Sequence, residues 1–435
     1  MKKIKPTKHL LWSMLLILPA ALFAQTKNEF SVKQAVDYGV KNSAIVKNAL
    51  LDIKIQKENN REFTSIAYPQ LNGSVGVNDY FDIPKSVVGG TAVSFGTKYN
   101  GNAGFDLSQI LFDGQVFVGL KARKSAVLLS TKTAEVTSEQ IKTNIYKIYY
   151  QLVVGKKQLG SIDANIDRFE KLLADVKTIF KNGFAEKLDI DKTQVQLNNL
   201  QTEKIKIENL LEAGNASLKF LMNMPQKEEL ILTDTLSEAE LKSGILEEAY
   251  NYNDRKEIQL LNIAAKLNGY NVKRFQLSQL PSLSMSASYT KNAQRDNFNF
   301  FNKGDWFTST LVGVRLSVPI FDGMGRNARI QAAKLAVAKI NNTLQQTKEQ
   351  MDNDVIISKL KMKAAILTID NQKQNVQLAE QVFNTTRKKY EQGLGSNQEI
   401  YNTQTELKVA QTNYYSALYD AIIAKIDYLK AVGKL

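Results

Sequence analysis

Leu107-Ser108-Gln109-Ile110-Leu111-Phe112-Asp113-Gly114 is followed 209 residues later by a similar stretch, Leu316-Ser317-Val318-Pro319-Ile320-Phe321-Asp322-Gly323. Two other landmarks recur in the same order at nearly the same spacing. They are Phe180-x-x-Gly183 with Tyr390-x-x-Gly393, and Tyr68-Pro69 with Leu280-Pro281. Three ordered landmarks indicate an internal duplication. We therefore expect two structural repeats, residues 25–223 and 242–435, joined by a linker at 224–241.

Long helices are predicted in each repeat. Residues 115–224 and 320–435 contain no proline, so nothing interrupts a helix there. In the first of these stretches, apolar side chains recur in alternating steps of three and four residues from Ile141 to Val176, which is the spacing of a coiled-coil seam. The predicted helices span 31–66, 115–182, 187–222, 242–278, 324–391 and 397–432. The helices after residues 114 and 323 would each be roughly 100 Å long.

Strand patterns occupy the remaining part of each repeat, at about 69–113 and 281–320. Leu283, Met285, Ala287 and Tyr289 alternate with serines and a threonine, and the other segments alternate similarly. Such alternation is typical of membrane β-strands, although a half-buried soluble sheet gives the same pattern. Four strands cannot close a barrel, so several chains would have to share one. Three copies would supply twelve strands, giving a mainly α fold with membrane β-structure.

The first 24 residues have the pattern of a signal peptide. Lys2, Lys3, Lys5 and Lys8 precede an apolar run from Leu10 to Leu18, and Ala24 offers a small residue for cleavage. The alternative is an uncleaved anchor, but the run is shorter than the ~20 residues that a membrane-spanning helix needs. We therefore expect an exported chain.

The composition excludes several kinds of chemistry. The chain has no cysteine and one histidine, His9, which lies inside the predicted signal peptide. Thiol nucleophiles, histidine bases and Cys/His metal sites are therefore excluded from the mature chain, and we expect no cofactor, metal or catalytic residue. The net charge of +14 falls to +10 without the signal peptide. Its lysines are spread singly along helices, which favours solvated helix faces over nucleic-acid binding.

With the duplication, the paired strands and the helix lengths, the sequence resembles the outer-membrane efflux protein (TolC) family. The resemblance covers essentially the whole mature chain. It implies a homotrimer with a twelve-stranded barrel in the outer membrane of a Gram-negative bacterium and a helical tunnel in the periplasm. It also implies a passive exit duct for efflux or type I secretion, joined to an inner-membrane pump through a periplasmic adaptor protein.

The resemblance also places candidate functional residues at the periplasmic tip. The tip turns fall at Gly183 and Gly393, the tip acids at Asp189 and Glu399, and the gating tyrosine at Tyr390. In threefold assembly the six carboxylates would form a negative ring, whereas in one chain they are ordinary partners of a helix dipole. The family's further acid and arginine fall on Asn402 and Gly395, so the closed state is expected to be weaker or built differently.

At the other end, each strand-to-helix junction carries an Asp-Gly pair after an aromatic residue. The two junctions are Phe112-Asp113-Gly114 and Phe321-Asp322-Gly323. Both aspartates are expected to cap helices rather than to catalyse a reaction. A periplasmic adaptor or a coiled-coil scaffold without a pore remains the alternative function, although a duplicated hairpin does not suit an adaptor.

Overall fold

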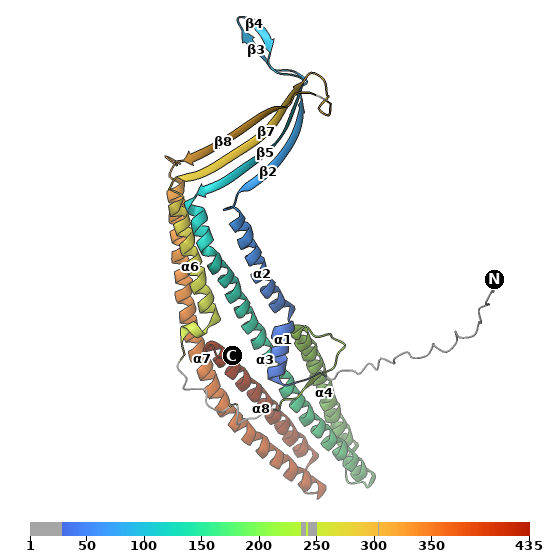
Figure 1. Ribbon diagram of the computed structural model, residues 1–435. Helices are drawn as coiled ribbons and strands as arrows, with labels where there is room; N and C mark the ends of the chain where they lie inside the picture. Colours follow the sequence, from blue (N-terminus) through green and yellow to red (C-terminus); the bar gives the residue numbers. More distant parts are fainter. Residues whose placement is uncertain (1–27, 236–240, 242–249, 303) are drawn as a thin grey trace, which may run out of the picture.

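The computed structural model describes residues 28–235, 241, 250–302 and 304–435, so the predicted signal peptide lies outside the described residues. Helices make up most of the chain, and a single four-stranded sheet lies at one end of them (Figure 1). The predicted fold class is confirmed. The helices are α1 Val32–Asn42, α2 Ala44–Ser65, α3 Gly114–Lys181, α4 Lys187–Met222, the short 3-10 helix Tyr252–Asp254, α6 Lys256–Leu277, α7 Gly325–Glu391 and α8 Asn397–Ala431.

Two long hairpins form the helical part, α3 with α4 and α7 with α8. The predicted coiled-coil seams supply their core, since Ile145, Phe169 and Val176 on α3 are fully buried. On α7, Met362 and Ile369 are 1% exposed. The helices depend on this packing between neighbours, because each offers only a narrow apolar stripe. No described helix is both long and apolar enough to cross a membrane.

The sheet joins the two repeats. Its antiparallel strands have the order β2-β5-β7-β8, and the pairing of β5 with β7 is the connection between the halves. Both edges, β2 and β8, have no neighbouring strand among the described residues. The strands are β2 Gln70–Asp79, β5 Tyr99–Phe112, β7 Ser282–Arg295 and β8 Phe307–Ser317.

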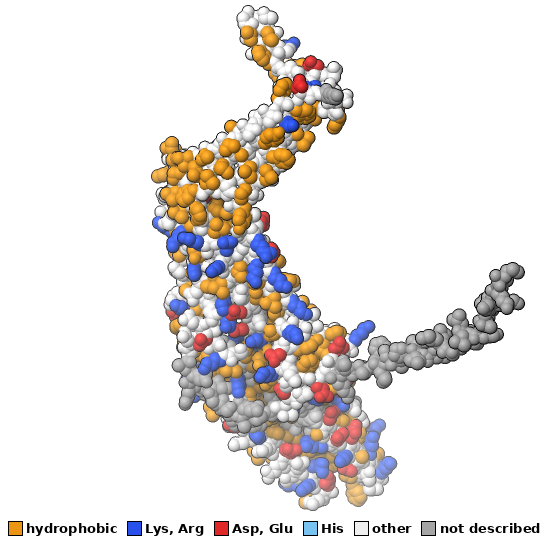
Figure 2. Space-filling model, in the orientation of Figure 1, with side chains coloured by type: hydrophobic (Ala, Val, Ile, Leu, Met, Phe, Trp, Pro, Cys, Tyr) orange, Lys and Arg blue, Asp and Glu red, His pale blue; other side chains and the backbone are white. Residues whose placement is uncertain are grey.

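The register places apolar side chains on one face of the sheet. Directly opposed residues of antiparallel strands share a face. One row across all four strands contains Leu71, Leu107, Ala287 and Val312, and the next row contains Ser108, Ser286 and Gly313. The predicted alternation is thus confirmed, and it continues across both repeats. This apolar face is open, with Val312 and Val314 68% and 65% exposed, and Figure 2 shows apolar side chains gathered over the strands.

Three boundaries differ from the predictions. The helix predicted over 31–66 is divided at Ser43, whose φ and ψ of −50° and 129° are not helical. The helix predicted from 242 begins only at Lys256, and residues 242–249 lie outside the described part. The strand predicted to reach 320 ends at Ser317. Pro319 accounts for this last difference, since it has no N–H to donate to a neighbouring strand.

Two small β-structures were not predicted. A hairpin of β3 (Lys85–Val88) and β4 (Thr91–Ser94) projects beyond the sheet (Figure 1). At mid-height of the helices, β1 (Asn28–Phe30) pairs in parallel with β6 (Leu230–Leu232). Tyr149 of α3 fixes this pair, because its buried hydroxyl donates to the Phe30 carbonyl at 2.8 Å. The described part of the predicted linker 224–241 therefore contains a strand.

Candidate functional site at the helical tip

The two hairpin turns lie at the end of the helices farthest from the sheet (Figure 1). Gly183 and Gly393 have φ values of +81° and +73°, which L side chains rarely adopt. In each turn the glycine N–H donates to the carbonyl three residues earlier, at 2.9 Å from Phe180 and 2.9 Å from Tyr390. The recurring aromatic-x-x-Gly motif therefore encodes a tight left-handed turn in both repeats.

Asp189 lies in the first turn of α4, where it acts as a helix cap. Its carboxylate oxygen Oδ2 accepts a hydrogen bond from the backbone N–H of Glu186 at 3.1 Å. Glu399 has the equivalent position on α8, and its own N–H donates to the Ser396 hydroxyl at 3.2 Å. Both acids thus sit at helix N-termini, where negative charge is favourable. The local geometry supports the capping role, and a role in a threefold ring stays a prediction.

Tyr401 of α8 makes the hydrogen bonds that tie the two hairpins together. Its hydroxyl oxygen lies 2.7 Å from the Thr193 hydroxyl on α4 and donates to the Asp189 carbonyl at 3.0 Å. Asn397 adds a third contact from α8, because its Nδ2 donates to the same carbonyl at 3.4 Å. Thr193 is completely buried and Tyr401 is 6% exposed. These bonds are therefore shielded from water, where breaking them is costly.

Burial and nearby acid keep the Tyr401 phenol neutral. Burial removes water from the phenol, and the negative charge of Asp189 lies nearby. Together they raise the pKa of Tyr401 to about 12. Tyr390 lies in the same cluster. Its pKa is raised by burial first and then by the charges of Asp189 and Asp175. Tyr390, however, makes no hydrogen bond through its hydroxyl to another described residue. Asp189 therefore acts on both phenols, and each phenol has a raised pKa.

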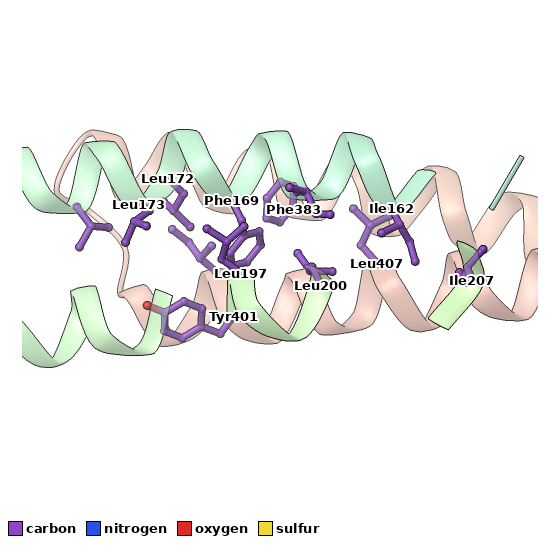
Figure 3. Close-up of a cluster of buried hydrophobic side chains, with 13 residues drawn as sticks. Ile162, Phe169, Leu172, Leu173, Leu197, Leu200, Ile207, Phe383, Tyr401 and Leu407 are labelled. Carbon is purple, nitrogen blue, oxygen red and sulfur yellow. The ribbon is translucent and has the colours of Figure 1, made fainter. Parts of the chain in front are cut away.

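An apolar cluster lies directly behind these polar contacts. Figure 3 shows its side chains pointing toward one another from the hairpins, with the Tyr401 ring at the margin of the cluster. Phe169 and Phe383 are 0% and 1% exposed and come from equivalent helices of the two repeats. The cluster contains Ile162, Ile166, Phe169, Leu172, Leu173, Val176, Leu197, Leu200, Ile207, Phe383, Ile400, Tyr401 and Leu407. A movement of one hairpin against the other would have to disturb this core.

At the opposite end, the first junction motif lies where β5 leads into α3 and where α3 packs against the end of α6. The Asp113 carboxylate caps α3, accepting from the N–H groups of Gln115 at 2.7 Å and Val116 at 3.3 Å. A Cβ on Gly114 would lie 2.8 Å from the Leu277 carbonyl oxygen at the end of α6. The glycine is therefore required for the close approach of the two helices.

The second junction has the same Phe-Asp-Gly sequence as the first, but its aspartate has a different position relative to the helix. The N-cap of α7 is Met324, which corrects the expectation that Asp322 occupies that position. Asp322 still satisfies the helix end, because its Oδ2 accepts from the Arg326 N–H at 2.8 Å. Gly323 and Met324 both have positive φ, +63° and +68°. Because α7 begins at Gly325 and α3 begins at Gly114, this turn places Asp322 two residues farther from its helix than Asp113 is from α3. Phe321 is 82% exposed here.

Sequence reasoning found Asp189, Glu399 and Tyr390 but missed Thr193, Asn397 and Tyr401. The available signal for Thr193 was its position as a polar residue in the mostly apolar heptad spacing of α4, between Ile190 and Leu197. Tyr401 lies beside the seam position Ile400, so its inward direction required the hairpin packing. No group of acidic or histidine side chains in the described part of the chain could hold a metal ion. The described contacts at the tip are hydrogen bonds and apolar packing between the two hairpins.

Comparisons with known proteins agree with this architecture. The sequence model of the family "Outer membrane efflux protein" matches residues 255–434. The outer membrane protein TolC of Vibrio cholerae serotype O1 is 20% identical over 77% of this chain and 77% of its own length. The proteases secretion protein PrtF of Dickeya chrysanthemi is 21% identical over 55% of this chain and 54% of its own. The crystal structure of the Campylobacter jejuni CmeC outer membrane channel superimposes with a TM-score of 0.78 at 17% identity, covering 93% and 85% of the two chains.

Proposed function

We propose that this chain is a member of the outer membrane efflux protein family, whose model matches residues 255–434, and that it is a passive exit duct across the outer membrane. A relative named as a proteases secretion protein shares its sequence, and a protein named as an outer membrane channel shares its fold. The duct would carry solutes that an inner-membrane pump delivers through a periplasmic adaptor. The helices would extend into the periplasm and end at the hairpin tip.

The open four-stranded sheet is the observation that carries the proposal. Its outer face is apolar along all four strands, and both of its edges lack a neighbouring strand among the described residues. Unpaired backbone groups cannot be exposed to hydrocarbon, so such a sheet requires closure by further copies. Three copies would give twelve strands, with β2 of one protomer pairing with β8 of the next. The polar face would then line a water-filled channel.

The helical hairpins would continue that channel into the periplasm. α3 contains 68 residues and α7 contains 67, so each spans roughly 100 Å at 1.5 Å per residue. Their matched lengths would give a tunnel of even height around the threefold axis. The scaffold and adaptor alternatives offer no partner for an apolar open-edged sheet, and the junction aspartates are occupied as caps rather than arranged as a catalytic pair.

Disulfide cross-linking between the two edge strands tests the closure. The natural chain has no cysteine, so each introduced thiol is unique. Val75→Cys on β2 would be combined in turn with single cysteines at positions 308–316 of β8. We expect oxidation of at least one pair in native membranes to give a covalent trimer. The single-cysteine variants are the matched controls and should remain monomeric on a denaturing gel.

Two results would contradict the proposal. Cross-linking that stops at dimers for every pair would exclude a closed threefold ring. A stable monomer in detergent-free buffer, with the same helix and strand content, would exclude the membrane location.

A further inference from the structure

The apolar face of the sheet continues onto the first turns of α3. Phe112 at the end of β5 is opposite Leu283, which lies on the apolar face. Its ring lies 5.6 Å from the ring of Phe117 on α3, and Phe117 is 47% exposed. Lys121 and Lys124 follow at the helical spacings of four and seven residues, so they lie along the same stripe. Along this stripe of α3, the exposed side chains therefore change from apolar to lysine within about two helical turns.

A cationic groove opens beside this stripe, between α2 and α3. It has a volume of about 490 Å³, and its lining contains four basic residues, Arg61, Lys121, Arg123 and Lys124, and no carboxylate. The remaining lining residues are Asn60, Thr64, Leu120 and Val127.

Arg123 is held in place at the base of the groove. Its guanidinium donates to the Thr64 hydroxyl and to the Leu120 carbonyl, and its own carbonyl accepts from Asn60. Arg61 is paired with Glu58 at 3.0 Å on the open side. The groove therefore combines a fixed guanidinium with two exposed lysines, a donor set that suits a phosphate group.

The sequence around the groove is biased toward positive charge. From Gly114 to Ala134, α3 has four basic residues and no acid, and α7 has five basic residues and no acid from Gly325 to Lys348. The sheet ends of these helices are their N-termini, where the helix dipole favours negative charge. Helix stability therefore does not account for the bias. Figure 2 shows the resulting band of Lys and Arg directly below the apolar sheet, on the same face.

We infer that the groove between α2 and α3 binds the phosphate headgroup of an anionic phospholipid in the adjoining membrane leaflet. The inference rests on the proposed placement of the sheet in a membrane. Lys121 lies seven residues after Gly114, about 10 Å along the helix, which the headgroup layer and a long lysine side chain can span. The acyl chains would lie against Phe117 and the apolar face above it. This contact would fix the height of the duct in the membrane.

Native mass spectrometry of the full-length protein in detergent tests the inference. The probes are phosphatidylglycerol and phosphatidylcholine with identical acyl chains. We expect phosphatidylglycerol to be retained in preference to phosphatidylcholine. Lys121→Gln with Lys124→Gln should weaken its retention by about fivefold for each charge removed. Lys121→Arg with Lys124→Arg keeps both charges and should retain the lipid.

The matched control removes two exposed lysines of α4 instead, Lys192→Gln with Lys206→Gln. This variant has the same net charge as the groove variant and should retain phosphatidylglycerol as the natural protein does. Equal retention of the two lipids, or equal loss in both lysine variants, would overturn the inference. Inorganic phosphate at millimolar concentration should compete weakly, since it lacks acyl chains. Complete displacement by inorganic phosphate would identify a free-anion site and would also overturn it.

The two proposals fail in different ways. If the protein needs detergent but retains the two lipids equally, the proposed duct is retained and the proposed headgroup site is rejected. A protein that is stable without detergent would remove the duct itself.

Discussion

The hydroxyl of Tyr401 on α8 lies 2.7 Å from the hydroxyl of Thr193 on α4, and this contact joins the two repeats at the tip. The two residues are not repeat equivalents. At the offset of 210 between the tip turns, Thr193 corresponds to Thr403, and Tyr401 corresponds to Asp191. Both threonines donate to the carbonyl four residues earlier on their own helix, Thr193 to Asp189 and Thr403 to Glu399. The local helix geometry is therefore repeated in the two hairpins, whereas the contact between Thr193 and Tyr401 is not.

Replacing Tyr401 by Phe should loosen the closed tip. The variant keeps the ring but loses the bonds to Thr193 and to the Asp189 carbonyl, a difference of about 1 kcal/mol for each bond. We expect basal conductance in planar bilayers to rise. Tyr390→Phe is the comparison variant, since the Tyr390 hydroxyl makes no hydrogen bond to another described residue. A similar rise in that variant would indicate that Tyr390 contributes to the closed state through contacts between protomers. Equal conductance of the natural protein and Tyr401→Phe would show that the Tyr401 hydroxyl does not hold the tip closed.

The charges of Asp189 and Glu399 can be tested separately from their capping roles. Asp189→Asn keeps an oxygen that can accept from the Glu186 N–H, and Glu399→Gln likewise removes only charge. If the six carboxylates form a ring, millimolar divalent cations on the periplasmic side should block the natural protein more strongly than this double variant. Titration of single-channel current with Mg²⁺ on each side provides the measurement. If the same Mg²⁺ concentration blocks the natural protein and the double variant, the two acids act only at their helix N-termini and do not form a cation-binding ring.

Much of the fold was predictable because its signals are local and repeated. The apolar seam of α3 predicts which face of the helix is buried at every turn. The absence of proline allows the helix to continue without interruption. The tight turns at Gly183 and Gly393 were equally predictable from the sequence. What the sequence could not supply was contact between repeats. Tyr401 is one aromatic residue among many until the hairpins pack, and only then does its hydroxyl meet Thr193.

The missed strands show a different limit. β1 and β6 have three residues each, too few to display an alternating pattern, and their parallel pairing joins segments about 200 residues apart. The hairpin of β3 and β4 did carry a local signal. Gly89 and Gly90 form its two-residue turn with φ values of +58° and +84°, between runs rich in valine.

The orientation of the strands predicts unequal effects of arginine at adjacent positions. Met285 is opposite Val314 on the apolar face, and Ser286 is opposite Gly313 on the polar face. Met285→Arg should therefore destabilise the inserted sheet by about 2 to 4 kcal/mol near the bilayer midplane, and Ser286→Arg should have a small effect. Urea unfolding in lipid vesicles measures both. Similar losses for the two variants would place both faces in the same environment.

Glu139 on α3 should limit stability at neutral pH. Its pKa is raised by burial first and then by the charge of Glu257, despite the nearby Lys256. A raised pKa in the folded state means that ionisation opposes folding at neutral pH. Below the ordinary value of about 4.3 the carboxyl is protonated in both states, and the opposition disappears. Glu139→Gln should therefore stabilise the helical part at pH 7.5 by at most about 1 kcal/mol, since the group is only half-buried.

The pH dependence separates this effect from a general gain in helix propensity. The advantage of Glu139→Gln should shrink as the pH falls through the raised pKa of Glu139, and it should vanish near pH 4. Thermal unfolding followed by circular dichroism in detergent gives the comparison at each pH. Glu406→Gln on α8 changes the net charge equally at an exposed position, so its effect should stay within about 0.5 kcal/mol at both pH values. A stabilisation by Glu139→Gln that persists unchanged at pH 4 would show that ionisation of Glu139 is not its cause.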